Sequence, residues 1–223
     1  MARQFAISDI HGCLKTFRKL VLEVIILTKE DTLFLLGDYI NKGADSRGVL
    51  DFIFELQNSG YKLKCLRGNH EQYLIDGLNY SWERIAFLNR GGRETLQSFG
   101  VENINQIPEK YLSFIQSLPF FFETENHLLI HAGLNFDLDD PYKDEFSMLN
   151  IRRMEVDMKK TGNKNIIHGH VPNSYMDIEN ALSFHDNHIS IDGGCVYSHI
   201  QVLNHLIALE INSGLLYLHK NID

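Results

Sequence analysis

The chain has 223 residues, of which 44% are hydrophobic and 22% are charged. This is the composition of an ordinary soluble globular protein, and the length suits a single domain, 1–223, with a substantial core. The formal net charge of −8 argues against stable binding to nucleic acid, because the nucleic-acid backbone attracts basic surfaces.

The three cysteines, Cys13, Cys65 and Cys195, are widely spaced. Since they form no CxxC or Cys–His pattern, they indicate neither a disulfide framework nor a zinc finger, and they fit a reducing, intracellular setting. The first residues lead directly into strand-like sequence, and no apolar stretch is long enough to span a bilayer. We therefore expect a cytoplasmic protein with no membrane partner.

Apolar periodicity in the first third of the chain alternates between strand and helix patterns. Strands are expected at 5–8, 32–36 and 61–66, and helices at 14–25 and 46–58. Ser46 is suited to cap the second of these helices. This alternation favours a largely parallel sheet at the start of the chain.

The rest of the chain divides into a helical part and a strand-rich part. Residues 72–118 show helical patterns that are interrupted by a turn at Gly91-Gly92. Strands are then expected at 127–131, 165–168, 189–192, 206–211 and 215–219. The segment Asn212-Ser213-Gly214 is a good hairpin turn between the last two. We predict a mixed α/β fold with four layers, α/β/β/α, in which helices flank two packed mixed sheets.

Five strand-like runs end in Asp, His or Asn close to glycine. They are Ser8-Asp9-Ile10-His11-Gly12, Leu36-Gly37-Asp38, Gly68-Asn69-His70, His131-Ala132-Gly133 and His168-Gly169-His170. Ligand sites in such folds gather at the carboxyl ends of strands, and glycine lets the backbone approach an ion. Oxygen and imidazole donors suit divalent metals. Each segment alone is more simply a turn, a cap or a structural histidine, but five together favour a metal site.

These segments resemble the signature of the calcineurin-like metallophosphoesterases. More narrowly they resemble the bacterial and phage branch of the phosphoprotein phosphatases, which includes the lambda phage phosphatase. The similarity extends from Asp9 to Asp192-Gly193-Gly194-Cys195. The resemblance implies two divalent metal ions, Mn²⁺ before Fe, Zn, Ni or Mg. Their ligands would be Asp9, His11, Asp38, Asn69, His131 and His170, with Asp38 shared between the two metals.

The same resemblance implies a mechanism. Asp38 would be catalytic because it holds both cations close enough to clamp one phosphate and one bridging hydroxide, which attacks phosphorus directly. His70 would act as the general acid that protonates the departing alkoxide. Phosphate would be bound by Asn69, Arg152 and Lys42.

Two of these assignments have neighbours that compete with them. Arg152 suits bidentate phosphate binding, but Arg153 could take its place, and a solvated surface arginine is the simpler interpretation of either. His168 could replace His170 as a metal ligand, because residues two apart in a strand face the same side. The Gly-His position of the family favours His170, which leaves His168 as a supporting or packing residue.

Three supporting positions depart from the family pattern. Asn41 and Lys42 stand where the family has Asp and Arg, and Asn150 replaces a Trp that usually precedes Arg152. Without a carboxylate beside it, His70 should hold a proton less readily. Lys42 keeps the positive charge but loses the planar fork of arginine. We expect a protein that binds metals but turns over standard phosphatase substrates slowly, or prefers another ester.

Three functions compete on this basis. We rank first a phosphomonoesterase of the serine/threonine protein phosphatase type, acting on a phosphorylated protein or a small phosphoester. A dinucleoside polyphosphate hydrolase shares the motifs, and an adenine pocket could be lined by Tyr73, Tyr80, Trp82 and Phe87, although core packing explains these aromatics more simply. The third is a metal-binding protein that recognises phosphorylated partners without catalysis, against which the presence of His70 argues.

Overall fold

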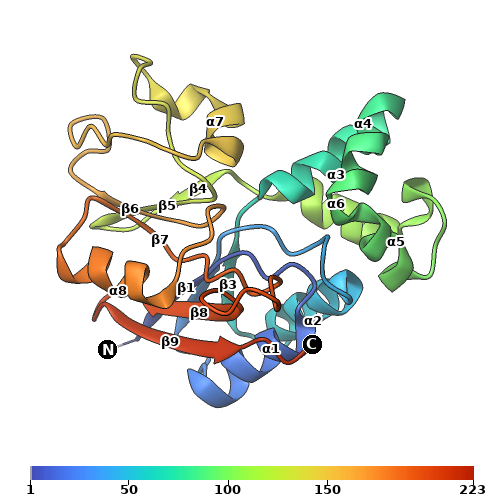
Figure 1. Ribbon diagram of the computed structural model, residues 1–223, viewed down its shortest axis with the longest axis horizontal. Coiled ribbons are helices and arrows are strands. Elements are labelled where there is room, and N and C mark those ends of the chain that lie inside the picture. Colours follow the sequence, from blue (N-terminus) through green and yellow to red (C-terminus); the bar gives the residue numbers. More distant parts are fainter. Residues whose placement is uncertain (1) are drawn as a thin grey trace.

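The computed structural model describes residues 2–223 and arranges them as two mixed sheets with helices outside them (Figure 1). The five-stranded sheet has the order β3-β2-β1-β8-β9, with β1 Gln4–Ile7, β2 Thr32–Leu35, β3 Lys62–Cys65, β8 His205–Glu210 and β9 Leu215–Lys220. The four-stranded sheet has the order β4-β5-β6-β7, with β4 Phe121–Glu123, β5 His127–Ile130, β6 Asn165–His168 and β7 His188–Ser190. The predicted mixed α/β fold with two flanked sheets is confirmed.

Strand direction determines where the chain can build a site. β1, β2 and β3 are parallel neighbours, and so are β5, β6 and β7. β8 and β9 complete the first sheet in antiparallel fashion, and β4 does the same for the second. The carboxyl ends of the parallel strands therefore share one edge in each sheet.

The core follows the two-residue period of the strands. On β1 and β2, Ile7 and Leu35 face the helical layer, whereas Ala6 and Phe34 face the other sheet. On β5, Leu129 lies between the sheets, whereas Leu128 and Ile130 face the outer side of the second sheet. The central strands β1, β2 and β5 are thus buried on both faces, which explains why they consist almost entirely of apolar residues.

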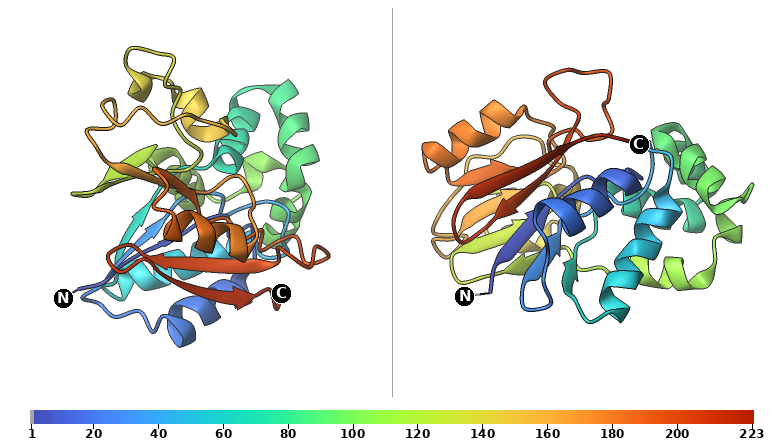
Figure 2. Two further views of the ribbon diagram at one scale, coloured as in Figure 1. Left: turned by 60° about the vertical axis from the view of Figure 1, so that its left-hand side comes forward. Right: turned by 90° about the horizontal axis from the view of Figure 1, so that it is seen from below.

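The helices cover the sheets from outside. Their bounds are α1 Leu14–Lys19, α2 Ser46–Asn58, α3 Asn69–Asn79, α4 Ser81–Phe87, α5 Arg93–Phe99, α6 Glu109–Ser117, α7 Glu145–Asn150 and α8 Tyr175–Ser183. α1 and α2 lie against the first sheet, and α3 to α6 form a helical group on one side of it (Figures 1 and 2). Within residues 2–223, no helix is both long and apolar enough to cross a membrane.

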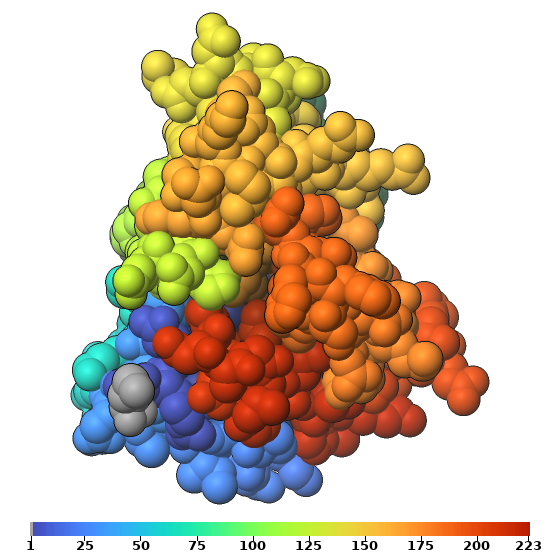
Figure 3. Space-filling view, turned by 90° about the vertical axis from the view of Figure 1, so that its left-hand side faces the viewer, coloured from blue at the N-terminus to red at the C-terminus, as the bar shows by residue number. Residues whose placement is uncertain are grey.

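α8 joins the two sheets at their other side. Its Ile178 is buried in the same cluster as Ile189 of β7 and Ile207 of β8. The space-filling view shows this part of the chain beside the C-terminal strands on one face (Figure 3). The inter-sheet core is therefore closed by a helix as well as by the sheets themselves.

The structure differs from the sequence prediction at several elements. The N-cap of α2 is Asp45, whose carboxylate accepts from Gly48 N at 2.8 Å, so the cap assigned to Ser46 is wrong. The helix expected at 14–25 changes to π geometry over Leu20–Val24. β4, α7 and α8 were not predicted, since a three-residue strand and short helices offer too little periodicity.

Candidate metal centre

The six residues expected to bind metal meet at the carboxyl edge of both sheets. Asp9 and His11 follow β1, Asp38 follows β2, and Asn69 begins α3 directly after β3. His131 and His170 follow β5 and β6 in the other sheet. Two sets of side chains each bring potential ligand atoms within 4.8 Å of one another. One set consists of His11, Asp38 and His70, and the other consists of Asp9, Asp38 and His131.

Asp38 belongs to both sets. Its Oδ2 lies 3.4 Å from Nε2 of His11, and its Oδ1 lies 3.6 Å from Nε2 of His131. Burial, and then the nearby carboxylates of Asp9 and Glu71, raise the pKa of Asp38 well above its ordinary value. Three buried carboxylates this close call for compensating positive charge, and a position shared by both sets suits a bridging ligand.

Backbone carbonyls orient two of the imidazoles. Nδ1 of His11 lies 3.0 Å from the carbonyl oxygen of Ile40, and Nδ1 of His131 lies 2.8 Å from that of Leu36. Because a carbonyl only accepts, each Nδ1 carries the proton and each Nε2 presents a lone pair to the site. This is the usual arrangement of a histidine that binds a metal.

Asn69 and His170 add acceptors to the same space. Oδ1 of Asn69 lies 3.0 Å from Nε2 of His131 and 3.3 Å from Nδ1 of His170. In the opposite orientation of the Asn69 amide, its nitrogen would donate to Asp38 and His131. With the oxygen directed into the site, Oδ1 is one more potential ligand atom. Nε2 of His170 is buried and has no hydrogen-bond partner among the described residues. Carboxylate, amide and imidazole acceptors converging in this way fit a pair of divalent cations.

The backbone around the site is held in unusual conformations. Of the ten described non-glycine residues with positive φ, six belong to this region: Asp9, His11, Asp38, Asn41, Lys42 and His170. Such conformations cost on the order of 1–3 kcal/mol each and persist only where the surroundings enforce them. Their concentration at one edge indicates a functional site rather than a set of ordinary turns.

Close backbone packing explains the glycines that accompany these residues. A Cβ on Gly37, whose φ is +97°, would collide with the backbone of Gly68. A Cβ on Gly169 would collide with the side chains of Ser8 and Asp9. The loops after β1, β2, β3 and β6 can therefore pack against one another only because glycine occupies these positions.

Glu71 connects two of these loops. It is fully buried, and its carboxylate accepts from the backbone N–H groups of Gly68, Asp38, Tyr39 and Ile40 at 2.9, 2.8, 2.9 and 3.3 Å. Burial raises the pKa of Glu71, and these hydrogen bonds oppose that rise. The side chain fixes the Asp38 loop to the start of α3.

Asn41 determines which nitrogen of His70 bears a proton. The Thr95 hydroxyl donates to Asn41 Oδ1 at 2.7 Å, so Asn41 Nδ2 faces His70 and donates to its Nδ1 at 2.9 Å. His70 is therefore neutral with its proton on Nε2. Although Nε2 lies in the group formed with His11 and Asp38, it is a donor there, which leaves His11 and Asp38 as the candidate metal ligands of that group. Burial, followed by the charges of His11 and Lys42, lowers the pKa of His70 well below its ordinary value.

A small cavity of about 80 Å³ opens over the ligand atoms. Lys42, Arg152, Asp192 and Tyr197 line it. Lys42 Nζ donates to Nε2 of His11 at 2.8 Å and to the Tyr197 hydroxyl at 3.3 Å. Although burial lowers the pKa of Lys42, the nearby Asp38 raises it, so the ammonium stays charged. The cavity thus presents two cationic side chains to an anion.

Some residues of the site were missed from the sequence, and others lie outside it. Asp192 is buried in the cavity lining, and burial together with Asp9 raises its pKa well above the ordinary value. Tyr197 lacked any pattern that marked it, and the segment that contains Thr95 gave no sign of a role at the site. His168 faces away from the centre, with Nε2 3.2 Å from Nδ1 of His188. Arg153 is exposed and does not line the cavity, which favours Arg152 as the phosphate-facing arginine.

A model of the calcineurin-like phosphoesterases matches residues 3–203. This is most of the chain, and the chain therefore belongs to that family, whose members use two divalent metals. The sequence resemblance to the superfamily is thus confirmed.

Curated relatives are symmetrical bis(5′-nucleosyl)-tetraphosphatases. The protein of Nitrosospira multiformis is 30% identical over 132 residues, which is 58% of this chain and 43% of that protein. The protein of Proteus mirabilis is 39% identical over 71 residues, or 32% of this chain and 25% of its relative. The chain thus spans less than half of the length of these relatives.

Solved structures show the same fold with little sequence identity. A putative diadenosine tetraphosphatase has a TM-score of 0.63 and 20% identity, with 100% of this chain and 95% of the other covered. A protein serine/threonine phosphatase from Saccharomyces cerevisiae has a TM-score of 0.68 and 13% identity, with 100% and 81% covered. At these identities the similarity supports the fold alone. Since one structure is of a putative diadenosine tetraphosphatase and the other of a serine/threonine phosphatase, it does not distinguish between these two functions.

Proposed function

We propose that the protein hydrolyses the phosphoanhydride chain of a dinucleoside polyphosphate, and that two divalent cations assist the reaction. The curated relatives are symmetrical tetraphosphatases, and they support this function. They favour it over the serine/threonine protein phosphatase that ranked first from the sequence. Cleavage of a tetraphosphate at its middle anhydride consumes one water and releases two nucleoside diphosphates. The hydrogen bond from Asn41 to His70 carries the argument.

Hydrolysis of a phosphoserine ester needs a strong acid. The conjugate acid of an alkoxide has a pKa near that of water, about 15.7, so the leaving oxygen must be protonated as it departs. In this site Asn41 donates to His70 Nδ1. His70 is thereby neutral, and a neutral imidazole is a far weaker acid than an imidazolium. Phosphoserine is therefore a poor match to the site.

A phosphoanhydride makes no such demand. Its leaving group is a phosphate whose second pKa is about 6, so it departs as an anion at neutral pH without a proton. His70 can still donate a hydrogen bond from Nε2 to a phosphoryl oxygen. The loss of the supporting carboxylate at position 41 thus suits the cleavage of an anhydride better than that of an alkyl ester.

The remaining residues take roles that follow from their positions. Asp9, His11, Asp38, Asn69, His131 and His170 would hold the cations, with Asp38 between them. When bound, such a pair supplies an activated water and neutralises charge on the phosphoryl group. Arg152 and Lys42 bind the non-bridging oxygens at the mouth of the cavity, where Lys42 lies deeper and Arg152 is exposed.

The test compares substrates on one preparation supplied with Mn²⁺. Diadenosine tetraphosphate, a phosphoserine peptide and an aryl phosphate are assayed, and the products of the first are separated by chromatography. We expect ADP as the sole nucleotide product and a kcat/KM for the dinucleotide well above that for the peptide. Faster turnover of the peptide would contradict the proposal. Retained metal with no turnover of any substrate would favour a non-catalytic phosphate-binding protein instead.

A further inference from the structure

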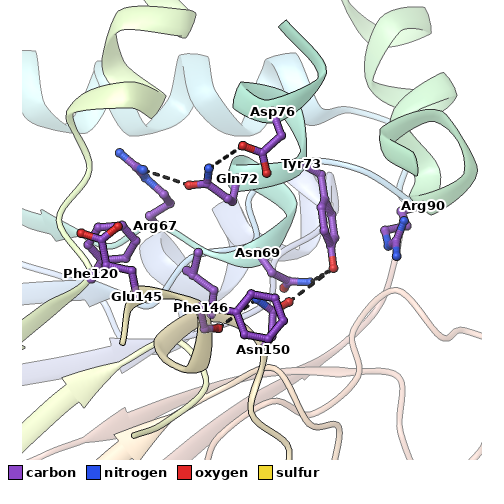
Figure 4. A pocket seen from close by; sticks show the side chains of 11 residues that line it. Arg67, Asn69, Gln72, Tyr73, Asp76, Arg90, Phe120, Glu145, Phe146 and Asn150 are labelled. Carbon is purple, nitrogen blue, oxygen red and sulfur yellow. Dashed lines mark hydrogen bonds between the residues drawn. The ribbon is translucent and has the colours of Figure 1, made fainter. Parts of the chain in front are cut away.

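A groove of about 460 Å³ lies beside the metal centre, between α3 and α7 (Figure 4). Its volume lies within the range of about 300–1,000 Å³ that is typical of small-molecule sites. Side chains of α3 form one wall and side chains of α7 the other. The groove is much larger than the cavity over the ligand atoms and is separate from it.

Asn69 connects the groove to the metal centre. It lines the groove as well as the small cavity. On the groove side its Nδ2 donates to the Tyr73 hydroxyl at 3.3 Å, and that hydroxyl donates to Asn150 Oδ1 at 3.4 Å. A molecule in the groove could therefore extend past Asn69 and place a phosphate over the cations.

The groove presents aromatic surface to solvent. Phe146 projects from α7 and is 75% exposed, and Tyr73 faces the groove from α3 (Figure 4). Of the aromatics considered as an adenine pocket in the sequence, only Tyr73 lies here. Phe87 is buried in the core as expected, whereas Tyr80 and Trp82 are exposed and stack on each other, so core packing was the wrong explanation for those two.

The groove also contains two arginines, Arg67 and Arg90, beside the carboxylates of Asp76 and Glu145. Among residues 2–223, neither Arg67 nor Arg90 forms an ion pair. The Arg90 guanidinium lies over the Tyr73 ring, 4.5 Å from its centroid. Nε of Arg67 is buried without a hydrogen-bond partner among the described residues. The two carboxylates balance the arginines in number, but within the described residues neither guanidinium is held in a close ion pair, so both can face an anion.

We propose that this groove binds one nucleoside diphosphate half of the substrate, with its base against Phe146 and Tyr73 and its phosphates directed past Asn69. Arg90 then faces the anionic chain. The assignment rests on the proposed function and adds to it the location of the nucleoside. Aromatic faces stack with any base, and arginine binds phosphate oxygens. A phosphopeptide would use neither a flat stacking surface nor a second unpaired arginine in this way.

Phe146→Ala tests the stacking surface, because its exposed ring contributes little to the core. We measure kcat/KM for diadenosine tetraphosphate and for phenyl phosphate, which is too small to reach the groove. The ratio of the two should fall by at least about fivefold, the lower end of what base stacking on an aromatic contributes. Phe146→Tyr should restore the ratio. Phe184→Ala, at an aromatic that is 79% exposed beside α8, is the matched control and should leave the ratio unaltered.

A second measurement separates this assignment from the proposed function. Inhibition of phenyl phosphate hydrolysis by ADP reports nucleotide binding even in a protein that does not cleave the dinucleotide. A higher inhibition constant for ADP in Phe146→Ala and in Arg90→Gln supports nucleotide binding in the groove, whatever the substrate of the wild-type protein is. An unaltered constant in both variants overturns the assignment, and so does an equal loss of phosphoserine-peptide turnover in Phe146→Ala.

Discussion

At the scale of single residues, the supporting side chains around His70 decide which leaving groups the site can release. Asn41 donates to Nδ1 of His70, while Thr95 holds the amide in that orientation. An aspartate at position 41 would instead accept a hydrogen bond from Nδ1–H and stabilise the imidazolium. The chemistry of the site is thus adjusted by a residue that does not itself touch the cavity.

The double variant Asn41→Asp, Lys42→Arg should therefore raise turnover of an aryl phosphate. A carboxylate beside His70 strengthens the acid, and arginine adds a bidentate contact to phosphate. We expect a gain of about 10- to 100-fold in kcat, the scale of supporting-residue effects at metal sites. The gain should be largest for the least acidic leaving phenol in a series of substituted aryl phosphates.

Lys42→Arg alone serves as the matched control for that series. It alters the phosphate contact without changing the acid, so its gain should not depend on the leaving group. If the double variant shows no gain on any aryl phosphate, the interpretation of His70 as a weakened acid is wrong.

The sequence anticipated the convergence of the six proposed ligands, because each one follows a strand whose end is marked by glycine. It did not anticipate Thr95, Asp192 or Tyr197. Thr95 lies 54 positions from its partner Asn41, and no local pattern relates the two. Asp192 was noted only as the end of the matching segment. Contacts between loops depend on how the sheets pack, which periodicity within a strand does not encode.

At the scale of elements, Glu71 attaches α3 to the loop after β2. Replacing it with Gln turns two acceptor sites into donors that face backbone N–H groups. Each unsatisfied buried group costs about 1–3 kcal/mol, so we expect Glu71→Gln to lower the free energy of unfolding by about 2–4 kcal/mol. The Asp38 loop should loosen as well, which would weaken metal binding about 10- to 100-fold.

Urea denaturation and metal titration check this prediction. Glu102→Gln is the control, since that side chain is exposed and the same chemical change should affect neither property. Unaltered stability in Glu71→Gln would mean that the two N–H groups that face the new amide nitrogen find other acceptors.

A second connection between elements depends on pH. Asp31 is buried and accepts from the backbone N, Nε and Nη2 of Arg3, at 2.9, 3.3 and 2.7 Å, and from the N–H and hydroxyl of Thr28. Burial raises the pKa of Asp31, but these hydrogen bonds outweigh it and hold the pKa well below its ordinary value. The carboxylate ties the segment before β1 to the segment before β2.

Because the pKa of Asp31 is depressed in the folded state, the contribution of Asp31 to the free energy of unfolding is complete above the ordinary pKa of about 3.9. This contribution is lost as pH falls below that value. Asp31→Asn should cost about 2 kcal/mol at pH 7. The difference from wild type should shrink between pH 4 and pH 2, measured by urea denaturation on both proteins. A difference that stays constant over this range would contradict the assignment of the effect to the carboxylate charge.

The elements themselves were predicted well where their patterns are long. β1, β2, β5 and β6 are buried on both faces and consist mainly of apolar residues, and α2 extends over 46–58 as its periodicity indicated. β3 alternates exposed lysines with apolar residues, which is the pattern of a strand with one face in solvent. β4 has three residues, and α7 has six. Such short elements are stabilised by packing against β5 and the cluster around Met148 rather than by their own sequence.

At the scale of the whole molecule, the candidate metal centre joins the two sheets. Asp9, His11 and Asp38 extend from the first sheet, and His131 and His170 extend from the second. The carboxylates repel one another, and several of these residues have strained backbones. Without cations this edge opposes the packing of the sheets, whereas with cations it becomes a cross-link between them.

Metal binding should therefore raise the stability of the entire fold. A ligand that binds only the folded state at 100 times its Kd adds about 2.7 kcal/mol, which for a chain of this size raises Tm by about 5–10 °C per site. Adding Mn²⁺ to chelator-treated protein should produce this shift in calorimetry. Asp38→Asn should abolish it and lose both metals in elemental analysis, because Asp38 belongs to both ligand sets. Asp137→Asn, at an exposed position, should retain the full shift, and an equal shift in all three proteins would place the cations elsewhere.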